Sequence, residues 1–170
     1  MTSKLQNWEP LAARILSAIA EACRNVYADR LISLAVFGSV ARGAWKANSD
    51  IDLLLVLSNL PAGRFNQIRE FEPVESLLQE RIAECRRAGW NVDVSPVFKT
   101  PAHVLHGSPL FLDMTQEALI LVDCGHLVKD RLDLMRKRME ALKSKRIWYG
   151  HDSWTWILKP DFHVGEAIVL

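Results

Sequence analysis

Apolar and polar residues follow two different periods along this chain, and the two periods separate short strands from longer helices. Four short apolar runs are rich in strand-forming residues, and each is followed by turn-forming residues. These runs predict four β-strands, at Leu31–Phe37, Ile51–Leu57, Val92–Phe98 and Ala118–Val122.

Helical spacing of apolar residues predicts helices between and after these strands. We expect helices at Pro10–Arg24, with the proline in the first turn, and at Arg64–Ala88, kinked or split at Pro73. The segment 101–117 is expected to form short helices or loop. A last amphipathic helix is predicted at 127–145, with a buried stripe formed by Val128, Leu132, Met135, Met139 and Leu142.

Strands and helices alternate without a repeat or a linker, which predicts a single domain over residues 1–170. The expected fold class is α/β or α+β, with a small mixed β-sheet flanked by helices. We expect residues 31–98 to form the core that carries the chemistry. Residues 126–170 would add a C-terminal helix and an aromatic tail.

Composition and charge exclude several classes of protein. Apolar residues make up 49% and charged residues 24% of the chain, and the formal net charge is +1, which is typical of a globular protein and not of a disordered or bulk nucleic-acid-binding chain. The segment Leu11–Ala22 is interrupted by Arg14 and Glu21, so an amphipathic helix explains it better than a signal peptide. We expect a cytoplasmic protein without a membrane span.

The candidate chemistry begins with acidic residues in strands. Asp50 and Asp52 flank Ile51, and side chains two positions apart on a strand share a face. Asp93, between two valines of the third predicted strand, repeats this arrangement once. If the strands are neighbours, three carboxylates meet, and at about 4 Å each like-charge pair costs about 4 kcal/mol at an effective dielectric near 20. A divalent cation, Mg²⁺ or Mn²⁺, would relieve this repulsion.

A second motif, Gly38-Ser39, follows the first predicted strand. A glycine there allows a phosphate to approach the backbone, and the helical turn from Ser39 offers amide donors to an anion. Arg42, in the same loop, either contacts a phosphate or braces the loop through a salt bridge. Ser49 is expected to close the turn before the second strand.

Together these residues resemble the DNA polymerase β type nucleotidyltransferase superfamily, and within it the minimal nucleotidyltransferases. The resemblance is carried by Gly38-Ser39-x-x-Arg42-Gly43, by Ser49-Asp50-x-Asp52 and by the isolated Asp93.

The resemblance implies an enzyme that moves a nucleoside monophosphate from an NTP, ATP above all, onto a hydroxyl group. It implies two Mg²⁺ or Mn²⁺ ions held by Asp50, Asp52 and Asp93, and phosphates bound at Gly38 and Ser39. Minimal nucleotidyltransferases often occur as antitoxins of HEPN-type toxins, so the implied acceptor is a tyrosine of such a partner.

Two other functions remain open from the sequence. One is nucleotidyl transfer to an aminoglycoside-like small molecule, although such enzymes usually add a further drug-binding domain. The other is a non-catalytic antitoxin or binding module on the same fold. A purely steric role does not need three acids, which argues against the second alternative.

The C-terminal third carries no recognisable motif. Its aromatic residues either complete the core, which we favour, or stack on a base or a partner; they are Trp148, Tyr149, Trp154, Trp156 and Phe162. Residues 125–146 contain eight Lys or Arg against three acids, a local charge of +5. A solvated helix face explains this charge more simply than a nucleic-acid partner, and the sequence leaves a homo-oligomer open.

Overall fold

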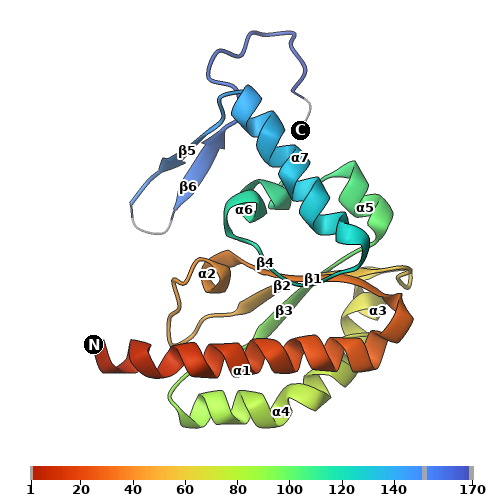
Figure 1. The fold of residues 1–170 in the computed structure, drawn as a ribbon, viewed down its shortest axis with the longest axis vertical. Coiled ribbons are helices and arrows are strands. Elements are labelled where there is room, and N and C mark those ends of the chain that lie inside the picture. The colour runs from red at the N-terminus through yellow and green to blue at the C-terminus, as the bar shows by residue number, and fades with distance from the viewer. Residues whose placement is uncertain (1, 151–152, 169–170) are drawn as a thin grey trace.

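The fold is a four-stranded β-sheet between two layers of helices, with a separate β-hairpin near the C-terminus (Figure 1). The computed structural model describes residues 2–150 and 153–168, and side chains from residue 10 onward within those ranges. The sheet has the order β3-β2-β1-β4. Its strands are β1 (Leu31–Phe37), β2 (Ile51–Leu57), β3 (Val94–Lys99) and β4 (Leu119–Asp123).

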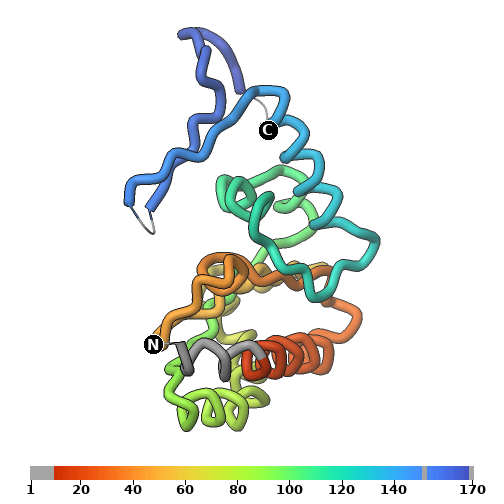
Figure 2. The backbone as a smooth tube through the Cα atoms, turned by 60° about the vertical axis from the view of Figure 1, so that its left-hand side comes forward, coloured from red at the N-terminus to blue at the C-terminus, as the bar shows by residue number. Residues whose placement is uncertain are grey.

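Helices cover both faces of this sheet. One face carries α1 (Thr2–Tyr27) and α4 (Glu72–Arg87), and the other carries α5 (Pro101–His106), α6 (Leu110–Glu117) and α7 (Leu127–Ala141), as Figure 2 also shows. The connections include α2 (Gly38–Ala41), α3 (Arg64–Arg69) and the 3₁₀ turns η1 (Ala28–Arg30) and η2 (Cys124–His126). The hairpin consists of β5 (Lys145–Trp148) and β6 (Trp154–Ile157).

The strand β2 is buried on both of its faces. Its alternate residues Ile51, Leu53 and Leu55 pack into the core beside α1 and α4, whereas Leu54 and Val56 pack into the core beside α6 and α7. A strand covered on both faces reads as a continuous apolar run. Asp52 has the same parity as Leu54, so it lies at the end of the face that α6 and α7 cover.

The register of the sheet places the two sequence motifs side by side. The strand β1 pairs antiparallel with β2 so that Phe37 lies opposite Asp52. The strand β2 pairs parallel with β3, with Ile51 opposite Val94. The Gly38 loop and the carboxylates at the start of β2 therefore meet at one end of the sheet.

Most predicted elements are confirmed, and β1 and β2 have the predicted bounds. The first helix differs, because it runs from Thr2 to Tyr27 and contains Pro10 inside it instead of beginning there. The predicted helix 64–88 is divided into α3 and α4, with Pro73 in the first turn of the second helix. The third strand begins at Val94, so Asp93 lies just before it.

The last predicted helix ends four residues early. Lys143 adopts a left-handed backbone with φ of 56°, and the Ser144 amide donates to the Met139 carbonyl at 2.9 Å, which closes the helix. Leu142, predicted in the buried stripe, therefore lies beyond the end of α7. The other four members of that stripe are buried as expected.

The aromatic tail forms the hairpin β5–β6 and does not fold into the core as a whole. Trp156 packs in part against the core beside α7. Trp148 and Tyr149 remain 47% and 64% exposed. The interpretation of the aromatic residues as core is thus confirmed only for Trp156.

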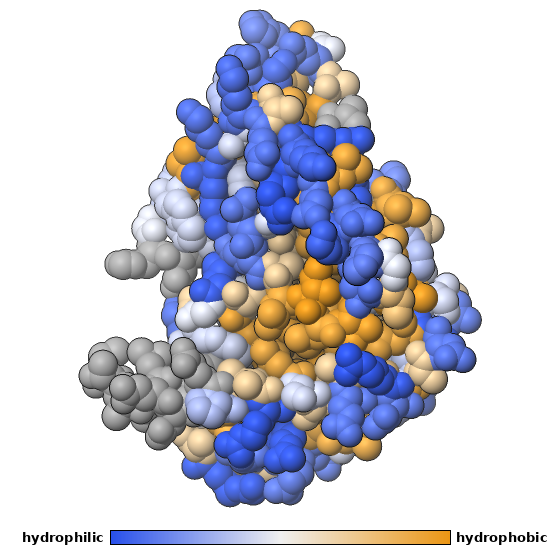
Figure 3. Space-filling model, in the orientation of Figure 1, coloured by the Kyte–Doolittle hydropathy of each residue, from blue (hydrophilic) through white to orange (hydrophobic). Residues whose placement is uncertain are grey.

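One face of the molecule shows a continuous hydrophobic area between α7 and α1, where β4 runs as an outer strand (Figure 3). No residue of β4 is buried, and Leu119 is 44% exposed. This sheet edge is therefore both apolar and open. Among the described residues, no helix has the length and apolarity needed to cross a bilayer.

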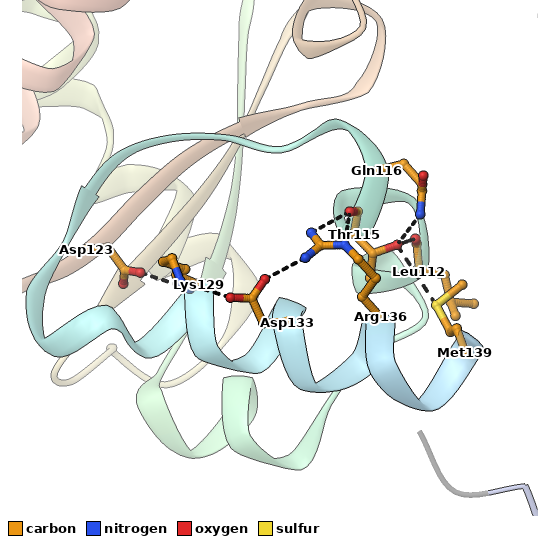
Figure 4. Close-up of polar contacts among 8 residues, drawn as sticks. All are labelled: Leu112, Thr115, Gln116, Asp123, Lys129, Asp133, Arg136 and Met139. Carbon is orange, nitrogen blue, oxygen red and sulfur yellow. Dashed lines mark hydrogen bonds and ion pairs between the residues drawn. The ribbon is translucent and has the colours of Figure 1, made fainter. Parts of the chain in front are cut away.

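Polar contacts attach α7 to the sheet and to α6 (Figure 4). Asp123 accepts hydrogen bonds from the Ser33 hydroxyl at 2.7 Å and from the Val128 and Lys129 amides at 3.1 and 2.9 Å. Arg136 donates to the Thr115 carbonyl at 2.8 Å, which satisfies one of the last carbonyls of α6. One carboxylate thus caps α7 and fixes it to β1.

We predict that Asp123→Ala lowers the free energy of unfolding by about 2 kcal/mol, because it removes a helix cap and leaves the Ser33 hydroxyl buried without this acceptor. Urea denaturation followed by circular dichroism measures the effect. The control is Asp133→Ala, which removes only ion pairs on the surface of α7 and should change stability little. Equal losses for the two variants would contradict this role of Asp123.

Candidate active site

A pocket of about 340 Å³ lies at the end of the sheet where the two sequence motifs meet. All of its lining residues come from the loop between β1 and β2 or from the start of β2. They are Ser39, Arg42, Ala44, Lys46, Asn48, Ser49, Asp50 and Asp52.

Gly38 is the residue on which the shape of this pocket depends. Its φ is 74°, a conformation that residues with a Cβ rarely adopt. A Cβ built at this position would overlap the carboxylate of Asp52. The turn is closed behind it, since the Arg42 amide donates to the Gly38 carbonyl at 3.2 Å and the Ala44 amide to the Ser39 carbonyl at 2.9 Å. The backbone and the carboxylate can therefore be neighbours only because position 38 is glycine.

The two carboxylates of the Asp-Ile-Asp motif both line the pocket, as the strand alternation predicts. Burial raises the pKa of the half-buried Asp52, the negative charge of Asp50 raises it further, and Arg42 partly opposes the rise. The charged form of Asp52 is thus disfavoured by its surroundings. A divalent cation would favour it, and Mg²⁺ is commonly held by one or two carboxylates together with water and substrate phosphates. The carboxylate oxygens of this pocket fit such an ion.

Asp93 lies near this pair in the sheet but is not among the residues that line the pocket. Its carbonyl accepts a hydrogen bond from the Ile51 amide at 2.8 Å, and its side chain is exposed. Within the described ranges, no group of three His, Cys, Asp or Glu side chains is gathered closely enough to hold a metal ion. A part for Asp93 in a metal site stays a prediction.

Arg42 makes the salt bridge that was one of its two predicted roles. Its Nη1 lies 2.9 Å from Oε2 of Glu117, and its guanidinium lies 4.6 Å from the centre of the Trp154 ring. It does so from the wall of the pocket. A contact between Arg42 and a phosphate stays a prediction.

The loop before β2 adds two polar residues that the sequence motifs did not single out, Lys46 and Asn48. Ser49 closes this loop as predicted, because its hydroxyl accepts from the Lys46 amide at 2.8 Å and its own amide donates to the Lys46 carbonyl at 3.1 Å. The signal in the sequence that could have identified Lys46 was its position between the Gly38-Ser39 motif and the carboxylate pair. Its position on the pocket wall depends on the turn that Ser49 makes.

The raised pKa of Asp52 predicts how the stability of the metal-free protein depends on pH. The folded state holds the Asp52 proton more tightly than the unfolded state, in which the pKa is near 3.8, so stability is lost as the pH rises above 3.8 through the raised pKa. Asp52→Asn removes this loss. In EDTA at pH 7 we expect its melting temperature to exceed that of the wild type by a few degrees.

This difference should disappear near pH 3.5, where the wild-type carboxyl is protonated as well. Thermal unfolding between pH 3.5 and 8 measures it, with Asp29→Asn, at an exposed position, as the control. An Asp52→Asn variant that melts below the wild type at pH 7 would contradict a raised pKa of Asp52 in the folded protein.

Comparison with known proteins agrees with this geometry. The family described as "Nucleotidyltransferase domain" matches residues 16–122, which contain β1 to β3, all of β4 except Asp123, the Gly38 loop and all three acids. The chain is 26% identical over 137 residues to "Putative protein adenylyltransferase MJ1305" of Methanocaldococcus jannaschii, and the match covers 79% of this chain and 88% of that protein.

Two solved structures also resemble the chain, each at 14% identity. The crystal structure of a toxin-antitoxin with AMP-PNP aligns with a TM-score of 0.43 over 75% of this chain and 91% of the other. A mutant of the toxin-antitoxin MntA-HpeT aligns with a TM-score of 0.41 over 72% and 87%. The family match covers more than half of the chain and includes its candidate active site, so this protein belongs to the nucleotidyltransferase domain family and is a nucleotidyltransferase.

Proposed function

We propose that this nucleotidyltransferase transfers AMP from ATP to a hydroxyl group of a protein in a reaction that requires Mg²⁺ or Mn²⁺. The observation that carries the proposal is the contact between the Gly38 backbone and the Asp52 carboxylate, which brings a phosphate-binding turn against a candidate metal ligand. The relative from Methanocaldococcus jannaschii supports the choice of AMP and of a protein acceptor, because it is named for protein adenylylation.

The reaction forms one bond and breaks another at the α-phosphorus of ATP. The acceptor oxygen attacks this phosphorus, the bond to the bridging oxygen of the β-phosphate breaks, and pyrophosphate leaves with the electron pair. The hydroxyl proton passes to a base or to water. Because the reacting groups are anions, catalysis depends mainly on positioning and on stabilising negative charge.

We assign the metal-holding role to Asp50 and Asp52, with Asp93 as the third acid. Two bound ions would lower the pKa of the attacking hydroxyl and neutralise charge on the leaving pyrophosphate. Asp93 lies just before β3, and its carbonyl accepts a hydrogen bond from the Ile51 amide, which places its backbone next to the residue between Asp50 and Asp52. The β- and γ-phosphates would be bound by the Gly38 and Ser39 amides, the Ser39 hydroxyl and Arg42.

A tyrosine on a HEPN-type partner is the acceptor that we would test first. This choice rests on the resemblance of the motifs Gly38-Ser39 and Asp50-x-Asp52 to minimal nucleotidyltransferases. A small-molecule acceptor would require a drug-holding surface, and within residues 2–150 and 153–168 only the hairpin and the segment after it extend beyond the sheet and its two helical layers.

A substitution at Gly38 tests the site directly, with Gly43 as a matched control. Gly38→Ala and Gly43→Ala both place a Cβ at a positive φ, of 74° and 71°, and so carry similar backbone strain of about 1–2 kcal/mol. Only Gly38→Ala displaces the Asp52 carboxylate, because nothing lies within 4 Å of a Cβ at Gly43. We expect Mg²⁺ with a non-hydrolysable ATP analogue to stabilise the wild type and Gly43→Ala by about 2.7 kcal/mol at a hundredfold excess over Kd.

Under the same conditions Gly38→Ala should gain no stability from the analogue. Differential scanning calorimetry with and without the ligand measures both effects. Equal stabilisation of the two alanine variants would contradict a role of the close approach between Gly38 and Asp52 in binding the nucleotide.

The transfer itself is tested by incubating the protein with ATP, Mg²⁺ and the product of the adjacent gene, and by measuring the mass of that partner. We expect an added AMP, lost in Asp50→Asn and in Asp52→Asn. Asp93→Asn should lower kcat by at least a hundredfold while leaving the affinity for the ATP analogue largely intact, since the third acid would act on the reacting hydroxyl.

Three other outcomes separate the alternatives. No adduct with several partners and all four NTPs would count against protein modification. Resistance of a sensitive host to an aminoglycoside would support the small-molecule acceptor. Protection from a toxin that is unchanged in Asp52→Asn would support a non-catalytic binding module.

A further inference from the structure

A connected set of charged and aromatic side chains joins the pocket to the C-terminal hairpin. Glu117, at the end of α6, forms ion pairs with Arg42 on the pocket wall and with Arg146 on β5. Its side chain is only 8% exposed, and those of Arg42 and Arg146 are 22% and 14% exposed. A carboxylate with so little access to water depends on the neighbouring cations to balance its charge, so the loss of either arginine would leave Glu117 less well compensated.

Trp154 of β6 is the second link in this set. The guanidinium groups of Arg42 and Arg146 lie 4.6 and 4.5 Å from the centre of its ring, within the range of cation–π attraction. Its indole nitrogen donates to Oδ1 of Asp113 at 2.7 Å. The Trp154 ring is therefore held by a hydrogen bond at its nitrogen, and two guanidinium groups lie within cation–π distance of it.

Asp113 anchors the hairpin to α6. Besides Trp154, the Trp156 indole donates to the same oxygen at 2.8 Å and Arg146 at 3.2 Å. Burial raises the pKa of Asp113, but these three hydrogen bonds outweigh burial and hold its pKa below the ordinary value. The carboxylate is thus charged at neutral pH and holds the hairpin in place.

The charges of this set balance within it. Arg42 and Arg146 carry two positive charges, and Asp113 and Glu117 carry two negative charges. Without Arg146 the buried Glu117 would depend on Arg42 alone, and without Trp154 the guanidinium of Arg42 would lose the aromatic surface beside it. The hairpin residues lie outside residues 16–122, the part that matches the family, although Arg42 and Glu117 lie inside it.

We propose that Glu117, Arg146 and Trp154 are positioning residues for nucleotide binding, which hold the Arg42 guanidinium on the pocket wall where the phosphates of an NTP would meet it. This inference rests on the proposed function, and it gives the C-terminal hairpin a role in nucleotide binding. An arginine that is already ordered loses less side-chain freedom when a phosphate binds, so preorganisation strengthens binding.

The test measures the affinity of the full chain for Mg²⁺ with a non-hydrolysable ATP analogue by calorimetry. We expect Trp154→Leu to weaken binding about tenfold, because it removes the cation–π contact that orders Arg42. Trp154→Phe keeps a ring beside Arg42 and should recover most of the affinity. Tyr149→Leu, on the same hairpin at a side chain that is 64% exposed, is the matched control and should bind like the wild type.

A double-mutant cycle separates positioning from general damage to the fold. If Trp154 acts through Arg42, then Trp154→Leu in the background of Arg42→Ala should weaken binding by less than twofold further. An equal loss in both backgrounds, or wild-type affinity in Trp154→Leu, would overturn the proposal. If Trp154→Leu does not unfold cooperatively, Glu117→Gln takes its place in the same cycle, with the same two outcomes.

The affinity readout distinguishes this inference from the proposed function. A wild-type protein that binds the analogue, shows the coupling between Trp154 and Arg42, and transfers no AMP would contradict adenylyl transfer and leave the positioning role intact. Normal AMP transfer without the coupling between Trp154 and Arg42 would contradict the positioning role and leave adenylyl transfer intact. A wild-type protein that binds no nucleotide would overturn both.

Discussion

The structure of this site depends on one close approach, between the backbone of Gly38 and the carboxylate of Asp52. The approach requires a residue without a Cβ, a positive φ, and a β1–β2 register that sets Phe37 opposite Asp52. Each requirement is met by a different level of structure: the residue type, the local turn and the sheet. The pocket exists where these three coincide, and its two carboxylates repel each other there, which is why the site is suited to cations.

The sheet converts this local approach into an extended site. A shift of β2 by one residue would turn Asp52 toward α1 and α4, away from the face that α6 and α7 cover. The strand β3, paired parallel with β2, then sets Asp93 beside Ile51. Core packing that is indifferent to the chemistry of Asp50 and Asp52 thus places both of them on the wall of one pocket.

The central strands and the carboxylate pair could be predicted from sequence because they are encoded locally. Apolar runs between turn residues defined β1 and β2, and the spacing of Asp50 and Asp52 defined a shared face. The features that could not be predicted depend on contacts between residues that are distant in the chain, or on backbone angles that the residue type does not indicate. Arg42 meets Glu117, which is 75 positions away, and the residue with positive φ after α7 is a lysine, Lys143, and not a glycine. The hairpin depends on Asp113, whose place near Trp154 and Trp156 follows only from the packing of α6 against α7.

The pairing of β1 with β2 has a consequence for how such a pocket can diversify. The loop between the two strands is held at both ends by the ladder, at Phe37 and at Asp52, and its middle is held through backbone groups of Ala44 and Lys46, so the side chains at these two positions can change while these bonds remain. Ala44, Lys46 and Asn48 nevertheless face the pocket. The side chains that line the middle of the pocket can therefore vary separately from Gly38 and the two acids, which lie at the strand ends.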